Sequence, residues 1–196
     1  MNYCSQCAGP VQLRQPAGDD RPRHVCDRCG TIHYQNPKLV AGAIIEQGGK
    51  LLLCRRAIEP RYGTWTIPAG YMENGETVAE CARREAREEA GANLAAIAPY
   101  ALLDLPFIGQ VYFVFRAALA TPDVQAGTES LEVRFFDPAE IPWSELSFAV
   151  VRQVLRSYCD DRAGGVYPFR NLEVPHPDGE GEDWLCGWHP AGRIPE

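Results

Sequence analysis

Short hydrophobic runs separated by glycines and prolines predict a sheet over much of the chain. The run at 39–46 is almost continuously apolar, which is typical of a strand buried on both faces. Gly48 and Gly49 predict a turn, and residues 50–55 its hairpin partner, in which Cys54 is a small core residue. Three more strands are predicted, at 98–105, 110–119 and 129–136.

Two helices are predicted among these strands. The first covers residues 78–90, because Thr77 and Glu80 form a capping box and Gly91 supplies a left-handed stop. The second covers residues 143–161, where apolar side chains recur on adjoining turns. Strands on either side of the first helix, and a helix near the end, predict an α/β fold with a mixed sheet between helices. The first helix also carries an apolar stripe formed by Val78, Ala82, Ala86 and Ala90.

Three carboxylates share one face of the first predicted helix. At about 100° per residue, Glu85, Glu88 and Glu89 fall within about 100° of one another, beside the apolar stripe. Like charges at this spacing repel unless a cation compensates them, and carboxylates are ligands that Mg²⁺ and Mn²⁺ favour. The alternative is a solvated helix stabilised by pairs such as Glu80–Arg84 and Arg84–Glu88. The spacing alone leaves both interpretations open.

Two CxxC pairs near the N-terminus indicate a zinc ribbon. Eighteen residues separate the pairs, and a two-residue spacer lets both cysteines of a pair turn toward one metal ion. Four sulfur ligands leave no open coordination position, which favours structural zinc over a redox dithiol or a catalytic metal. His24 and His33 flank the second pair and are interpreted as bystanders. The predicted ligands are Cys4, Cys7, Cys26 and Cys29.

Composition narrows the class of protein. The chain has 196 residues, of which 45% are hydrophobic and 23% charged, as in ordinary globular proteins. Its net charge of -7 argues against broad nucleic-acid binding, although bound divalent cations can make an anionic substrate acceptable. No apolar run is long enough to span a bilayer and no signal-peptide core is present. These features predict a cytoplasmic protein with no membrane partner.

The stretch from Gly70 to Ala92 resembles the Nudix box: a glycine, five residues, a glutamate, seven residues, then Arg-Glu-x-x-Glu-Glu-x-Gly. Alanine at 86 and 92 departs from the bulky aliphatic residues usual there. The resemblance implies a Nudix α/β/α sandwich over 36–162, preceded by the zinc ribbon at 1–35 and followed by a tail at 163–196. The matching positions are Gly70, Glu76, Arg84, Glu85, Glu88, Glu89 and Gly91.

The same resemblance implies a reaction and its ligands. Nudix hydrolases split the pyrophosphate bond of nucleoside diphosphate derivatives with Mg²⁺ or Mn²⁺. By position in the box, Glu85, Glu88 and Glu89 would bind the metal, Arg84 would orient them, and Gly70 would offer its carbonyl. For Glu76 we favour a supporting role over a ligand. A further acidic group is expected from a later loop or strand: Glu129 first, and Glu132 second.

The substrate follows from a longer resemblance, over about residues 3–160, to the plant plastid FAD pyrophosphatases and their bacterial relatives, which also cleave ADP-ribose. It rests on segments such as YQNPKLVAGAIIE and DLPFIGQVYFVF. Two alternatives stay open: an NADH pyrophosphatase or NAD-decapping hydrolase, although its Ser-Gln-Pro-Trp-type motif is missing, and a non-catalytic zinc-ribbon regulator that binds a nucleotide. A homodimer is also compatible with the family.

Four aromatic rings are candidates for stacking on the substrate, and each could equally be a core residue: Tyr62, Trp65, Phe107 and Tyr112. Cys186 and His189 are interpreted as part of a loosely packed tail rather than as a metal pair.

Overall fold

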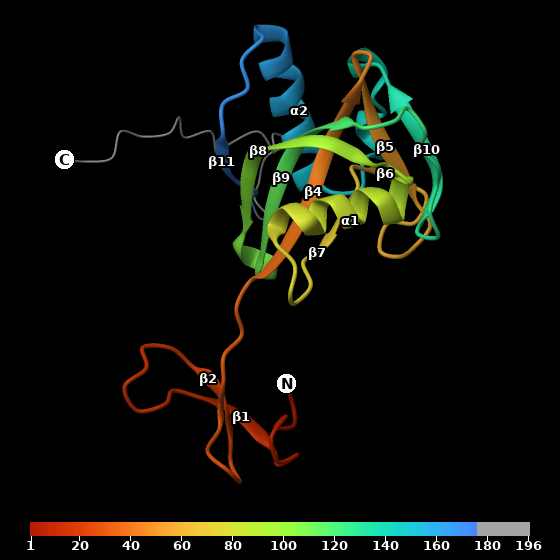
Figure 1. The fold of residues 1–196 in the computed structure, drawn as a ribbon. Helices are drawn as coiled ribbons and strands as arrows, with labels where there is room; N and C mark the ends of the chain where they lie inside the picture. Colours follow the sequence, from red (N-terminus) through yellow and green to blue (C-terminus); the bar gives the residue numbers. More distant parts are fainter. Residues whose placement is uncertain (176–196) are drawn as a thin grey trace, which may run out of the picture. The chain divides into compact units, whose positions relative to one another are not determined.

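The computed structural model describes residues 1–175, which form two compact units, Met1–Asn36 and a second that begins at Pro37 (Figure 1). The predicted Cys186 and His189 lie outside the described residues. The first unit is a small antiparallel sheet with the order β1-β2-β3, and its short strands were not predicted. They are β1 (Val11–Arg14), β2 (Arg23–Cys26) and β3 (Ile32–His33).

The second unit is built on a mixed sheet with the strand order β10-β5-β4-β9-β8-β11. The pairs β4–β9 and β8–β11 are parallel, and β5–β4, β10–β5 and β8–β9 are antiparallel. These strands are β4 (Lys38–Gln47), β5 (Lys50–Arg56), β8 (Leu94–Leu105), β9 (Gln110–Leu119), β10 (Ser130–Phe136) and β11 (Arg170–Glu173).

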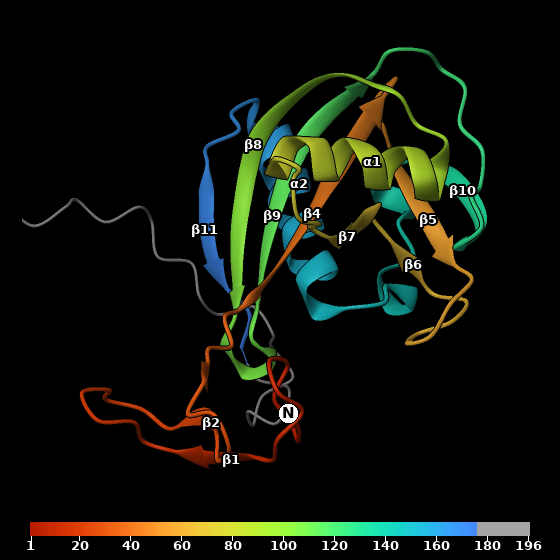
Figure 2. The same ribbon diagram turned by 60° about the horizontal axis from the view of Figure 1, so that its bottom comes forward.

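Strands β4 and β5 separate soon after their hairpin. They pair only at Glu46–Leu51 and Gln47–Lys50. Further along, β6 (Trp65–Thr66) pairs with β5, and β7 (Ala69–Tyr71) pairs with β4, so the segment between them occupies the space that opens (Figure 2). This arrangement delivers Gly70 to the start of the box.

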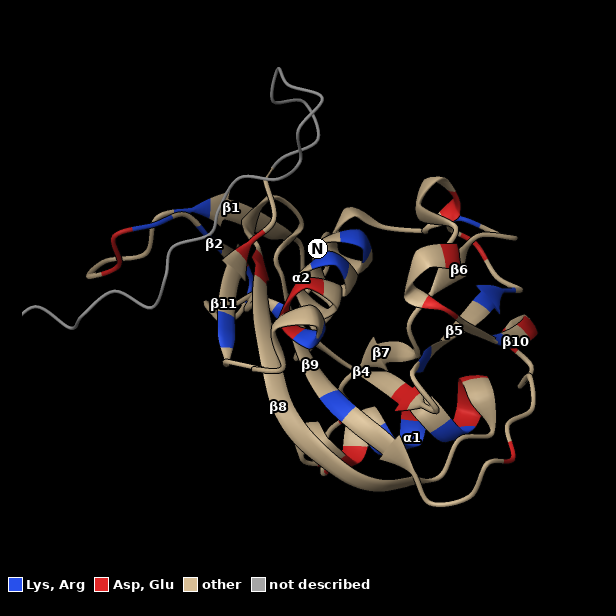
Figure 3. Ribbon diagram, turned by 90° about the horizontal axis from the view of Figure 1, so that it is seen from above, with Lys and Arg blue, Asp and Glu red and all other residues tan. Residues whose placement is uncertain are grey.

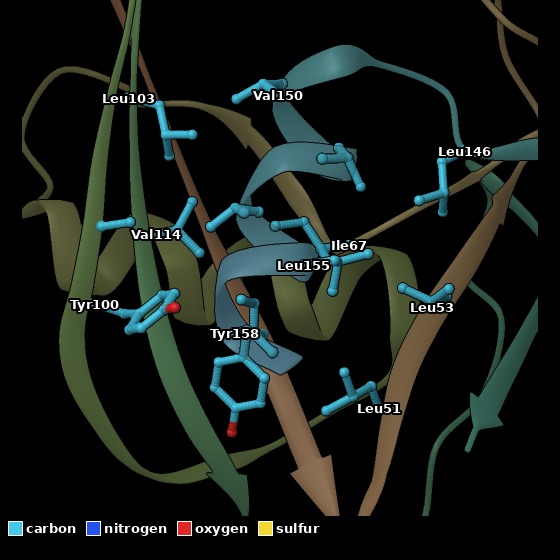
Figure 4. Close-up of a cluster of buried hydrophobic side chains, with 14 of the residues drawn as sticks. Leu51, Leu53, Ile67, Tyr100, Leu103, Val114, Leu146, Val150, Leu155 and Tyr158 are labelled. Atoms are coloured by element: carbon cyan, nitrogen blue, oxygen red, sulfur yellow. The ribbon is translucent and has the colours of Figure 1, made fainter. Parts of the chain in front are cut away.

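One helix lies on each face of the sheet, which confirms the predicted α/β/α sandwich. Helix α1 (Val78–Ala90) buries Ala86 and Ala90 against residues of β4 and β5. Helix α2 (Ala149–Gly164) packs Val154 and Leu155 into the larger core on the other face (Figure 4). The central strand β4 is buried along most of its length, as its apolar run predicted.

The second helix begins later than predicted. Residues 143–145 form a short 3-10 turn (Trp143–Glu145) after Pro142, and α2 starts only at Ala149 with extended Phe148 as its N-cap. The reason lies at Ser147, whose backbone N–H and hydroxyl both donate to the carbonyl of Trp65, at 2.8 Å each. That contact holds the chain extended before the helix can start. Two other 3-10 turns are Pro106–Ile108 and Pro138–Glu140.

Strand β11 lies in the part of the chain that was expected to be a tail. It pairs in parallel with β8, and Leu172 is buried in the larger core. A buried carboxylate secures it: Asp161 accepts hydrogen bonds from the Tyr100 hydroxyl and from Arg170 Nε, both at 2.7 Å. The sequence missed this strand because four residues carry too little periodicity to be recognised. Among residues 1–175, no helix is both long and apolar enough to cross a membrane.

If β11 belongs to the core, Leu172→Ala will lower the free energy of unfolding by about 2–4 kcal/mol, as truncation of a buried leucine to alanine usually does. Urea denaturation measures the change. The matched control is Val166→Ala, because Val166 lies four residues upstream of β11 with an exposed side chain. Equal, small effects of both variants would show that residues 170–174 do not contribute to the core.

Candidate active site

Helix α1 orients the box glutamates by its capping and its alanines. Thr77 and Glu80 form the predicted capping box, and Gly91 ends the helix in a left-handed conformation. Because alanines line the buried face, the helix backbone packs close to the sheet. Glu85 and Glu89 are consequently 9% and 7% exposed, whereas the side chain of Glu88 is 58% exposed. Only two of the three predicted carboxylates therefore point inward.

The Glu85 carboxylate lies close to the Gly70 backbone, in the space that a side chain at position 70 would occupy. A β-carbon on this glycine would lie 2.2 Å from Glu85 Oε1 and 2.5 Å from Oε2, so only glycine lets the side chain lie here. The Gly70 carbonyl accepts from Cys81 Sγ at 3.8 Å. One residue earlier, the Ala69 backbone N–H donates to Glu89 Oε2 at 3.2 Å. The β7 segment thus touches both inward carboxylates.

Arg84 binds several acidic groups at once. Its guanidinium forms a two-point contact with Glu76 (Nε–Oε2 3.0 Å and Nη2–Oε1 2.8 Å), and its Nη1 lies 2.6 Å from Glu85 Oε1 and 3.1 Å from Glu88 Oε2. Its hydrogen bond lowers the pKa of Glu76 to about 2. The supporting geometry that we favoured for Glu76 is present in the structure. Figure 3 shows the acidic and basic residues interspersed along α1.

Of the three box glutamates, Glu89 is the one that Arg84 does not contact. Burial raises its pKa to about 8, the Glu85 charge adds to this, and the single backbone donor at Ala69 opposes it. Burial also raises the pKa of Glu85, which Arg84 partly offsets. Each carboxylate keeps one oxygen, Glu85 Oε2 or Glu89 Oε1, for which the described residues supply no hydrogen-bond donor. A pair of carboxylates in this state has the chemistry of a hard divalent-cation site.

A loop from β9 to β10 brings Glu129 toward the same place. Its Gln125 and Gly127 backbone N–H groups donate to the Ala90 and Glu89 carbonyls, at 2.8 and 3.1 Å, at the end of α1. A β-carbon on Gly127 would lie 1.7 Å from the Glu88 carbonyl oxygen. In addition to the dominant effect of burial, the charge of Glu129 raises the pKa of both Glu85 and Glu89. Glu132 lies within β10, where it is the cross-strand neighbour of Arg55 on β5.

The aromatic candidates separate into core and surface. Trp65 is a core residue: it is buried and meets Phe136 edge-on with ring centroids 4.8 Å apart. Its ring is therefore not free for stacking. Tyr112 is half-buried on β9 beside the larger core, whereas Tyr62 and Phe107 are exposed.

The first unit gathers the four predicted cysteines. The sulfur atoms of Cys4, Cys7, Cys26 and Cys29 all lie within 4.8 Å of one another, and among residues 1–175 no other group of three or more candidate ligands is as tight. A tetrahedral zinc ion fits this donor set. His33 Nε2 lies 3.3 Å from Cys4 Sγ, a hydrogen-bonding distance, and His24 is not part of the group.

Comparison with known families identifies this arrangement. A model described as the NUDIX domain matches residues 36–156, and one described as Nudix N-terminal, a zinc ribbon, matches residues 2–35. The chain belongs to the Nudix family. A crystal structure of a NUDIX hydrolase from Nitrosomonas europaea is 48% identical, with a TM-score of 0.83, and the match covers 88% of this chain and 99% of that one.

Two curated relatives point to nucleotide substrates of their own. The NAD-capped RNA hydrolase NudC of Stutzerimonas stutzeri is 30% identical over 171 residues, 85% of this chain and 59% of that protein. The ADP-ribose pyrophosphatase of Methanocaldococcus jannaschii is 33% identical over 113 residues, 56% of this chain and 67% of that protein. The chain spans about three fifths of the length of the NudC relatives that it matches.

The buried pair makes stability depend on pH in the metal-free protein. The folded-state pKa of Glu89, about 8, exceeds the ordinary glutamate pKa of 4.5, so the folded state binds more protons between these values. Stability should therefore fall as pH rises from about 5 to 8, and level off above that. Because one pKa unit corresponds to about 1.4 kcal/mol, the change is on the order of a few kcal/mol.

Chemical denaturation in the presence of a chelator, at pH values from 5 to 9, measures this slope. Glu89→Gln should flatten it and raise stability at pH 8. Glu88→Gln is the matched control, because Glu88 precedes Glu89 on α1 and its side chain is 58% exposed. This variant should keep the wild-type slope. A steep slope retained in Glu89→Gln would assign the effect to another group.

The close approach of Gly70 and Glu85 predicts a second effect. Gly70→Ala should force the Glu85 side chain to move and lower the free energy of unfolding by about 1–3 kcal/mol, as overpacking does. Thermal and urea denaturation measure it. Gly164→Ala is the control, because a β-carbon there meets no atom within 4 Å. Equal stability of Gly70→Ala and wild type would mean that Glu85 does not need this space.

Proposed function

We propose that this protein is a metal-dependent nucleotide pyrophosphatase that cleaves nucleoside diphosphate derivatives and releases AMP. FAD and ADP-ribose are the leading substrates. The observation that carries the proposal is the pair of inward carboxylates, Glu85 and Glu89, whose charges are only partly compensated by neighbouring donors. A solvated helix does not bury two acidic groups side by side, since each costs free energy without a cation.

In this proposal, each residue of the site has a role in binding the metal or in orienting its ligands. Glu85, Glu89 and the exposed Glu88 bind Mg²⁺ or Mn²⁺, with Glu129 and the Gly70 carbonyl as further ligands. Arg84 orients Glu85 and Glu88 through its contacts with both. When bound, the metal neutralises phosphate oxygens and makes a coordinated water more acidic. Glu76 holds Arg84 in place by the two-point contact, so that Arg84 does not fully neutralise the ligands.

Zinc has a different role in this proposal. The four cysteines hold it in the first unit as a structural ion, because a site with four sulfur ligands has no open position for a substrate.

A second candidate is the hydrolysis of NADH or of NAD caps. It is favoured by the NudC relatives, which match along more than four fifths of this chain. The first unit offers little free positive charge for the body of an RNA: Arg14, Arg21 and Arg23 each lie beside an aspartate. The first candidate therefore ranks above the second.

A product assay on FAD, ADP-ribose, NADH and NAD, with Mg²⁺ or Mn²⁺, tests the proposal. AMP should appear from FAD or ADP-ribose. Glu85→Gln or Glu89→Gln should lower the rate by about 100-fold or more, because loss of a ligand should cost at least as much as the roughly 10- to 100-fold lost with a residue that only orients a ligand. Glu129→Gln should lower it by about 10-fold or more, whereas Glu132→Gln, its neighbour on β10, should stay within about 3-fold of wild type.

Faster turnover of NADH than of FAD or ADP-ribose would establish the second candidate. Folded, zinc-loaded protein that hydrolyses none of the four would leave a nucleotide-binding regulator as the function. A wild-type rate in Glu89→Gln would remove the metal site from the proposal.

A further inference from the structure

The end of the sheet where β8 and β11 finish and β4 and β9 begin carries an exposed apolar surface. Ile108, in the turn between β8 and β9, is 52% exposed, and Tyr71, the last residue of β7, is 50% exposed. Strand pairing places both at this end, because Tyr71 lies opposite Val40 on β4 and Gln110, two residues after Ile108, lies opposite Lys38. We call Ile108, Tyr71, Gln110 and Lys38 the sheet-end surface. Large apolar side chains that gather at one place, unlike single ones, indicate an interaction site.

Two contacts hold the Tyr71 ring at this surface. Gln110 Nε2 donates to the Tyr71 hydroxyl at 2.7 Å, and Lys38 Nζ lies 5.2 Å from the centroid of the ring. Among residues 1–175, no carboxylate lies at ion-pair distance from Lys38. The surface therefore presents an oriented aromatic ring, an aliphatic side chain and a positive charge without an acidic partner.

The described part of the chain ends next to this surface. Strand β11 runs parallel to β8, and its last residue, Glu173, lies opposite Asp104. The following residue, Val174, is buried, and its backbone N–H donates to the Asp104 carbonyl at 2.9 Å. Asp104 is only four residues before Ile108. The segment 176–196, which lies outside the described residues, therefore begins close to the sheet-end surface.

The sequence of this segment complements the surface in charge and in apolar character. An acidic run at 178–183 comes first, and large apolar residues follow it: Trp184, Leu185 and Trp188. The four acidic residues of the run are Asp178, Glu180, Glu182 and Asp183. Tryptophan side chains bury a large apolar area, and an acidic run next to Lys38 would supply the partner that the lysine lacks.

The segment is also long enough to cross the surface. Neighbouring strands lie about 4.8 Å apart, so the path from β11 across β8, β9 and β4 to β7 measures roughly 20 Å. The stretch from residue 176 to Trp184 can span about 30 Å when extended. A segment tethered at this distance has an effective concentration on the order of millimolar, which favours it over a second copy of the chain as the occupant.

We propose that residues 176–196 bind the sheet-end surface of the same chain. The rings of Trp184 and Trp188 cover the apolar side chains of the surface, and the acidic run lies beside Lys38. Apolar burial contributes most of the free energy of binding, because an exposed ion pair contributes little. The inference does not depend on the proposed function, since it adds no ligand to the metal site and no step to the reaction.

Limited proteolysis of the full chain, with a protease that cleaves after glutamate, tests the proposal. Mass spectrometry measures the rates of cleavage after Glu180 and Glu182. Binding should make both rates at least about 10-fold lower than in a synthetic peptide of residues 176–196, because each tenfold protection needs only about 1.4 kcal/mol. Ile108→Ser should raise the rates by about 5-fold, as expected when roughly half of an isoleucine side chain is no longer buried.

A tail variant tests the other side of the same contact. Trp188→Ser should raise the cleavage rates by a factor similar to that of Ile108→Ser. The double variant should be cleaved more slowly than the product of the two single effects predicts, because residues in contact are not additive. Equal additivity of the two changes would show that Trp188 and Ile108 do not share a contact.

The matched control is Leu131→Ser. Leu131 is a similarly exposed aliphatic residue, 45% exposed, but it lies on β10, the strand at the opposite edge of the sheet. This variant should leave the cleavage rates within about 1.5-fold of wild type. Thermal denaturation checks that every variant is still folded.

Three results would overturn the inference. The first is a wild-type chain that is cleaved as fast as the free peptide. The second is a cleavage rate that Ile108→Ser leaves unchanged or that Leu131→Ser raises equally. The third is protection that increases with protein concentration, because it would assign the segment to the surface of a second copy.

Discussion

The second unit is organised around the burial of two carboxyl groups in adjacent turns of one helix. Burying either carboxylate without a partner costs several kcal/mol, and placing Glu85 beside Glu89 adds repulsion. Three features make the arrangement possible. Alanines let α1 pack closely on the sheet, Gly70 leaves room for Glu85, and the Ala69 backbone N–H donates to Glu89. The remaining cost is the driving force for a divalent cation.

The separation of β4 from β5 follows from the same requirement. If the two strands paired along their full length, no space would remain for β6 and β7, and neither Ala69 nor Gly70 could reach α1. The separated edges are not left unpaired, because β6 bonds to β5 and β7 bonds to β4. The Ala43 backbone N–H likewise finds the Pro68 carbonyl at 3.1 Å. The sheet therefore opens without leaving its backbone groups unsatisfied.

Local signals predicted the parts of this structure that neighbours in sequence determine. The capping box at Thr77 and Glu80, the alanine stripe and the buried run in β4 depend on residues a few positions apart. Contacts between distant segments were not predicted. Ser147 hydrogen-bonds to Trp65 and so delays the start of α2, and the pairing of β11 with β8 places Leu172 in the core. Ala86 and Ala92, the two residues that depart from the usual Nudix box, are fully buried in the smaller core between α1 and the sheet.

The different exposure of the three box glutamates separates their roles in charge balance. Arg84 lies beside Glu85 and the exposed Glu88, but it is also bound at two points by Glu76, which shares its single positive charge. Glu89, on the inner side, has no cation at ion-pair distance among residues 1–175. An arginine placed against Glu89 would stabilise the metal-free protein and compete with the metal. The chain instead leaves Glu89 without an arginine at ion-pair distance among residues 1–175, so the site still favours a divalent cation.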